Sequence, residues 1–200
     1  MTDITKVESF IQAQEAYEQV QGILNSTVDS YLERTGDTDF KREIFLRQYD
    51  YMLQEMLLAV ALADGKVSPE EIKAIELIAK NGSIIKFMNQ GVALDEEPWK
   101  WEDFTESSPY IVAQHQLNLE ARLEDIIDNF NELLVITASG MDEPHKFLNL
   151  LGDLTRKIEV GVITVDGILS PEEDAVITKK MKEVYKASLA RVIAKMNSDD

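Results

Sequence analysis

The chain carries one eight-residue signature twice, and the acidic side chains of that signature could bind a metal ion. The signature, DGxxSPEE, spans Asp64–Glu71 and Asp166–Glu173. Each copy places an Asp where one expected helix ends and a Glu in the first turn of the next. Carboxylate oxygens are the ligands that hard divalent cations such as Ca²⁺ and Mg²⁺ prefer. If the two copies face one another, four carboxylates converge, and the predicted metal ligands are Asp64, Glu71, Asp166 and Glu173.

A second interpretation of the same residues needs no metal. Asp-Gly is a common turn signal, and Ser-x-x-Glu is the capping box, in which a Ser and a Glu side chain satisfy backbone N–H groups at the start of a helix. Pro69 and Pro171 stand at the first helical position, where proline is favoured. The sequence leaves both interpretations open.

The signature also resembles the second half of an EF-hand calcium loop. In that register the first two ligand positions would be Val60 and Leu62 in one copy, and Val162 and Thr164 in the other. None of these side chains is a carboxylate, although the EF-hand needs acidic ligands there. The sequence therefore argues against an EF-hand.

Signals for catalysis are weak in this sequence. The chain has no cysteine, which excludes disulfides, thiolate metal sites and cysteine nucleophiles. His115 and His145 are thirty residues apart and lack the spacing of an HExxH metal site, and the chain contains no GxSxG, Walker or Rossmann glycine pattern. We expect a non-catalytic protein.

Hydrophobic periodicity predicts helices on both sides of each signature. Apolar residues from Phe40 to Val60 recur every three to five positions, which indicates a helix capped by Thr38 or Asp39. The next helix starts at Ser68 and is expected to end at Asn81-Gly82, because these residues tolerate a left-handed turn.

The second half of the chain shows a similar pattern. One long helix is expected from Ser108-Pro109 to Gly140, another from Asp142 or Pro144 to Asp166, and a last one from Ser170 to about Met196. Residues 6–34 form one or two amphipathic helices, with Gly22 as the candidate break. We divide the chain into residues 1–36 (N-terminal helices), 37–92 (first helical unit), 93–109 (a loop) and 110–200 (a long helix and the second unit).

The similarity between the two helical units indicates an internal duplication. At an offset of 102 residues, seven of fifteen positions from Ala61–Ile75 are identical to Ile163–Ile177. The apolar positions of the preceding helices also keep the same phase. A repeat that matches in turn, cap and buried face is typical of duplication, so the predicted fold is an all-α helical bundle with an internally duplicated helix–turn–helix unit.

The expected loop at residues 93–109 is acidic and aromatic. It contains Trp99, Trp101 and Phe104 among several carboxylates. Exposed tryptophans often contact a partner, so we take these three residues as a candidate partner-binding element. The alternative is that the two tryptophans fold back as a lid on the bundle.

Composition limits the partners and the location. The formal charge of −17 disfavours nucleic acids, because their binding depends on Lys and Arg; cations or basic protein surfaces are the expected partners. The longest apolar run, Met56–Ala63, is much shorter than the roughly 20 residues of a membrane span. The absence of cysteine and of an apolar signal core favours a soluble, cytoplasmic protein with no integral membrane segment.

The segment Ala61–Ile72, ALADGKVSPEEI, resembles the hallmark of the tellurite-resistance TerB-like domains. The family's Asp-Gly pair and the Glu seven residues after the Asp match Asp64, Gly65 and Glu71, and in the second copy Asp166, Gly167 and Glu173. The resemblance implies an all-helical module whose acidic residues bind a divalent metal and which acts in stress response or in membrane-associated assemblies. A metal-free helical adaptor for a protein partner is the alternative.

Overall fold

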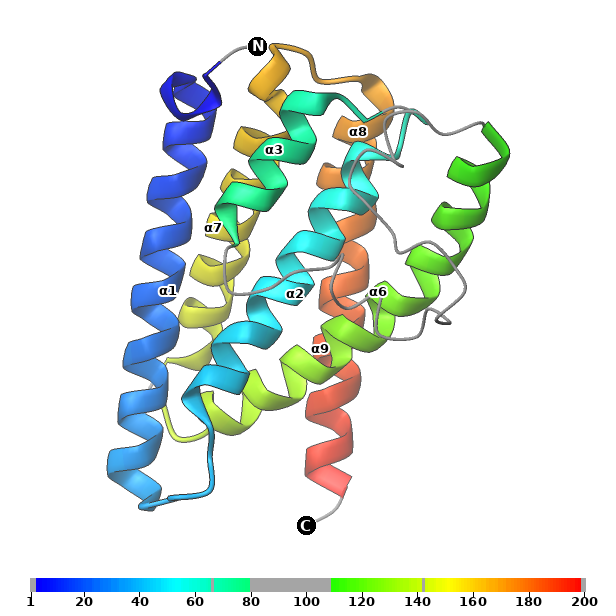
Figure 1. Ribbon diagram of the computed structural model, residues 1–200. Helices are drawn as coiled ribbons and strands as arrows, with labels where there is room; N and C mark the ends of the chain where they lie inside the picture. The colour runs from blue at the N-terminus through cyan, green and yellow to red at the C-terminus, as the bar shows by residue number, and fades with distance from the viewer. Residues whose placement is uncertain (1–2, 66, 80–108, 142, 199–200) are drawn as a thin grey trace, which may run out of the picture.

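The computed structural model describes residues 3–65, 67–79, 109–141 and 143–198 (Figure 1). Within these ranges the chain forms helices and connecting turns, with no strand, so the all-α prediction is confirmed. No helix in the described ranges is long and apolar enough to cross a membrane. The main helices are α1 (Glu8–Thr35), α2 (Arg42–Ala61), α3 (Pro69–Ile78), α6 (Pro109–Ala138), α7 (Pro144–Ile163), α8 (Pro171–Ala175) and α9 (Lys182–Ser198).

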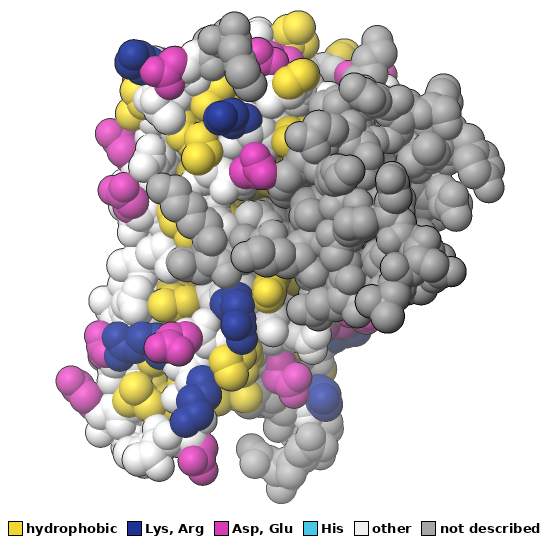
Figure 2. Space-filling model, viewed as in Figure 1, with side chains coloured by type: hydrophobic (Ala, Val, Ile, Leu, Met, Phe, Trp, Pro, Cys, Tyr) yellow, Lys and Arg dark blue, Asp and Glu magenta, His cyan; other side chains and the backbone are white. Residues whose placement is uncertain are grey.

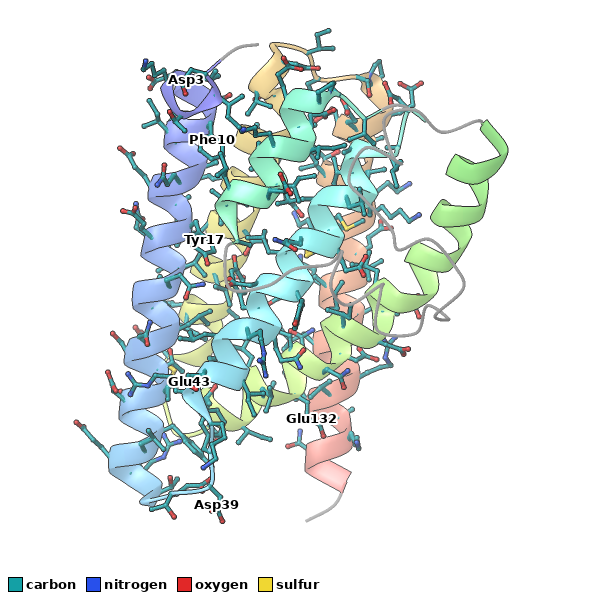
Figure 3. All side chains as sticks on the ribbon, viewed as in Figure 1. Asp3, Phe10, Tyr17, Asp39, Glu43 and Glu132 are labelled. Carbon is teal, nitrogen blue, oxygen red and sulfur yellow. The ribbon has the colours of Figure 1, made fainter. Side chains whose placement is uncertain are left out.

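Helix α2 occupies the middle of the bundle. It contacts α1, α3, α6 and α7, while α1 lies along α7 and α6 packs on α9 (Figure 1). Phe45 and Tyr49 of α2 meet Phe130 of α6 with ring centroids 5.7 and 5.4 Å apart. Phe10 and Tyr17 project from α1 toward the bundle (Figure 3). The buried apolar residues form one continuous core that extends along the chain from Ile4, just before α1, to Met181, just before α9.

The N-terminal segment is one helix rather than two. Helix α1 continues through Gly22 and ends only at Gly36, which has a left-handed φ of 64°. A single glycine inside a helix costs about 1 kcal/mol relative to alanine, and the packing of α1 along α7 offsets this.

The predicted cap of α2 is wrong. The residue before α2 is Lys41, and no side chain caps the helix there. Asp37 organises this connection instead, because its Oδ1 accepts hydrogen bonds from the backbone N–H groups of Asp39 (2.9 Å) and Phe40 (3.2 Å).

The last helix contains a feature that periodicity did not predict. A π-helical turn, Val176–Met181 (η4), separates α8 from α9. Glu173, Ile177 and Met181 are all buried and lie four residues apart. Residues four apart also share one face of an α-helix, so the buried face of this segment continues through the π turn.

Candidate acidic site at the two turns

The first DGxxSPEE turn is a glycine turn followed by a complete capping box. Gly65 has φ 82° and donates its N–H to the Leu62 carbonyl at 3.0 Å. The Ser68 Oγ then accepts from the Glu71 backbone N–H (3.1 Å), and Glu71 Oε2 accepts from the Ser68 backbone N–H (2.7 Å). The capping interpretation is confirmed for this turn.

The second turn repeats these interactions at equivalent positions. A 3₁₀ turn, Thr164–Asp166 (η3), leads to Gly167, which has φ 86° and donates its N–H to the Thr164 carbonyl at 3.0 Å. Ser170 Oγ accepts from the Glu173 N–H (3.1 Å), and Glu173 Oε2 accepts from the Ser170 N–H (2.6 Å). Ser170 therefore caps α8, as predicted.

The two capping glutamates are buried, and the two turns act on each other electrostatically. Glu71 is 3% exposed and Glu173 5% exposed. Burial, followed by the negative charges of Glu173 and Asp166, raises the pKa of Glu71 to about 8 against the opposing effect of its bonds to Ser68. Helix α3 also packs against η3, the turn that ends at Asp166. The structure therefore brings three of the four predicted ligands into one electrostatic neighbourhood.

The two aspartates of the signature lie at the exposed side of their turns. Asp166 Oδ1 accepts a hydrogen bond from the Ile168 backbone N–H (2.9 Å), so this side chain also stabilises its own turn. In the described part of the chain, no group of three or more His, Cys, Asp or Glu side chains is placed so that it could hold a metal ion. Metal binding at Asp64, Glu71, Asp166 and Glu173 stays a prediction.

The aromatic residues of the expected loop and the two histidine side chains are not among the parts of the chain that the structure describes. Trp99, Trp101 and Phe104 lie outside the described residues. His115 and His145 belong to α6 and α7, but their side chains are likewise outside it.

Sequence reasoning missed a set of buried polar side chains in the middle of the bundle. Asp50 is fully buried and accepts hydrogen bonds from Tyr17 Oη (2.8 Å) and Gln21 Nε2 (3.1 Å) on α1. Glu159 is 2% exposed on α7, and its burial raises its pKa to about 8. Both residues lie on the helix face that carries the regularly spaced apolar residues of α2 and α7, and this position could have indicated their burial.

On the face shown in Figure 2, acidic and basic side chains of the described residues are interspersed. The surface ion pairs include Lys6–Asp3 (3.0 Å) at the 3₁₀ turn that precedes α1, and Arg191–Asp128 (2.8 Å) between α9 and α6.

Comparison with known proteins adds no relative to this description. A scan against protein-family models gave no match, and searches of the curated proteins and of the solved structures gave none either.

Proposed function

We propose that the chain is a non-catalytic, TerB-like helical binding module whose two DGxxSPEE turns are duplicated halves of one acidic site for a divalent cation. A role in stress response or in a membrane-associated assembly follows from the family resemblance alone. The duplication is supported by the matching glycine conformations and by the two capping boxes, each of which has the same two hydrogen bonds.

One observation carries the cation proposal. Glu71 is buried beside the negative charges of Glu173 and Asp166, which come from the other turn. Like charges in a low-dielectric setting disfavour ionisation of the carboxyl, and a bound cation relieves the same repulsion. A proton and a divalent cation would therefore compete for this place.

The residues fit a partly hydrated cation better than a full protein cage. One oxygen of Glu71 and one of Glu173 accept backbone hydrogen bonds in the capping boxes, which leaves the other oxygen of each for a ligand. Mg²⁺ commonly keeps several waters and uses one or two carboxylates, whereas Ca²⁺ takes six to eight oxygen ligands. The exposed Asp64 and Asp166 would then contribute mainly charge.

Calorimetric titration with Ca²⁺, Mg²⁺, Mn²⁺ and Zn²⁺, together with melting curves, tests this proposal. Glu71→Gln and Glu173→Gln are the sharpest variants, because glutamine retains the capping box but removes the charge. At a hundredfold excess over Kd, a cation should stabilise the parent protein by about 2.7 kcal/mol. Both variants should lose this stabilisation, while the neighbouring Glu70→Gln and Glu172→Gln controls should keep it.

The double variant Asp64→Asn/Asp166→Asn tests the contribution of the exposed pair. Asparagine supports the same turns, so helical content by circular dichroism should stay close to that of the parent. The metal-induced rise in melting temperature should disappear. If the metal raises the melting temperature of this variant as much as that of the parent protein, neither aspartate contributes to the proposed site.

A metal-free adaptor is the second candidate, and two observations favour it. The capping boxes account for both glutamates without a metal. A groove of about 620 Å³ also lies between α1 and the start of α7, with Phe147 and the half-exposed Leu150 in its lining. If none of the four metals gives heat or a melting shift, the adaptor is the function that remains.

A further inference from the structure

A buried carboxyl group away from the two turns has no role in the proposed cation site. Glu159 of α7 is 2% exposed, and its Oε1 has no hydrogen-bond partner among the described residues. At the offset of 102 residues that aligns the two units, this position corresponds to Leu57, which is fully buried in α2. A carboxyl therefore stands where packing alone would favour an apolar side chain, and burying it in the ionised form carries a large free-energy penalty.

The hydroxyl group of Tyr49 links α2 to the surroundings of Glu159. Thr155 is one helical turn earlier on α7, and its Oγ1 is 3.1 Å from the Tyr49 hydroxyl of α2. Glu159 and Tyr185 of α9 both act electrostatically on Tyr49. The Tyr185 hydroxyl is buried and has no hydrogen-bond partner in the described part of the molecule. Tyr49 of α2 is therefore bonded to Thr155 of α7 and is affected by the charge of Glu159, which places the carboxyl at the contact between α2 and α7.

Little charge of the opposite sign reaches this carboxyl. Within the described ranges, Arg156 is the charged group that shifts the pKa of Glu159, and it lies exposed on the same helix. Among the other buried acids, Asp50 of α2 accepts hydrogen bonds from α1. The pKa of Glu71 in α3 is raised by burial and by the negative charges of the second DGxxSPEE turn. Glu55 of α2 is also buried but does not shift the pKa of Glu159.

The buried side chains that α1 contributes are apolar apart from Thr27. In η4, the buried side chains are Ile177 and Met181. The ionised form of Glu159 consequently has no buried partner of opposite charge on the helices described around it. Burial therefore favours the neutral, protonated acid in the folded protein.

We propose that Glu159 is a proton-binding site that couples the packing of α7 against α2 to pH. The carboxyl keeps its proton while α7 is packed against its neighbours. When it loses the proton, the charge must reach water, and the contact between these helices loosens. The device is independent of the cation site, because it uses none of that site's residues.

Urea unfolding between pH 5.5 and 9.5 tests this proposal. The folded protein keeps the proton up to about pH 8, whereas an unfolded glutamate releases it near 4.5. One linked proton changes the unfolding equilibrium constant by up to tenfold per pH unit. From pH 5.5 to 8, the constant of the parent should therefore rise by up to tenfold per unit relative to Glu159→Gln.

The controls separate this effect from other ionisations. Every variant is compared in a Glu71→Gln background as well, because Glu71 also titrates near pH 8. The exposed Glu143→Gln variant should remain parallel to the parent at every pH. Glu159→Leu, which introduces the residue found at position 57, replaces Glu159→Gln if the latter does not fold.

Two further measurements complete the test. In heavy water near neutral pD, the infrared band of a protonated carboxyl should be present in the parent and reduced in Glu159→Gln. At pH 9, amides of α7 should exchange faster in the parent than in Glu159→Gln. Parallel unfolding curves, an unchanged infrared band, or equal exchange rates would each overturn the proposal.

Discussion

Glu71 and Glu173 each combine a local and a long-range role. Locally, one carboxylate oxygen accepts the backbone N–H of the capping serine. Over a longer range, Glu71 lies in the field of Glu173 and Asp166. The motif that begins a helix therefore also brings negative charge into the contact between the two turns.

The caps themselves can be tested one residue at a time. Ser68→Ala and Ser170→Ala should each lower the free energy of unfolding by about 1 kcal/mol, because each removes a side-chain acceptor from a helix start. Denaturant midpoints measure this loss. Ser68→Asn and Ser170→Asn are the matched controls and should retain most of the stability, since asparagine is also a good cap residue. Equal midpoints for the alanine and parent proteins would contradict the capping role.

The contact between α1 and α7 depends on one small residue. A methyl group on Gly161 would lie 2.4 Å from the Ser9 backbone oxygen and 2.8 Å from Ala13 Cβ. The backbones of the two helices approach closely here, so α1 cannot yield by rotating a side chain. The crossing of these helices is therefore determined by the absence of a side chain at position 161.

We expect Gly161→Ala to destabilise the protein by about 1–3 kcal/mol, the usual range for overpacking. Gly152→Ala, in the same helix, is the matched control, because nothing lies within 4 Å of a methyl group at that position. It should raise stability by up to about 1 kcal/mol through helix propensity. Thermal unfolding of both variants checks the pair, and a stabilised Gly161→Ala variant would contradict the close contact.

At the scale of the whole molecule, the sequence predicted the helices and their caps better than the polar interior. Ser68, Ser170 and Gly140 mark helix ends through local chemistry, which a sequence displays directly. The burial of Asp50 and Glu159 depends on how distant helices pack, and a polar residue within an apolar phase does not reveal whether it is enclosed. The π turn η4 was missed as well, because the apolar spacing of this segment is equally compatible with a continuous α-helix.

The exposed charges behind the formal charge of −17 and the buried acids should affect stability in different ways. The two effects can be distinguished by their dependence on salt concentration. Exposed charges repel one another less when salt shortens the screening length, which is about 8 Å at 0.15 M and 3 Å at 1 M. At pH 8 to 9, added NaCl should therefore raise the urea midpoint of the parent protein. Buried charges are screened much less.

The pH dependence of stability should differ between the parent protein and the double variant Glu71→Gln/Glu159→Gln, and this difference should persist in 1 M NaCl. The sign follows from the raised pKa values: both groups hold protons up to about pH 8 in the folded protein, against a usual value of 4.5. Stability is greatest below pH 4.5 for these two groups and falls as the pH rises toward 8. The parent should accordingly lose stability from pH 5.5 to 8.5 more steeply than the double variant at both salt concentrations. If salt removes the difference in slope, surface repulsion rather than the buried acids accounts for the pH dependence.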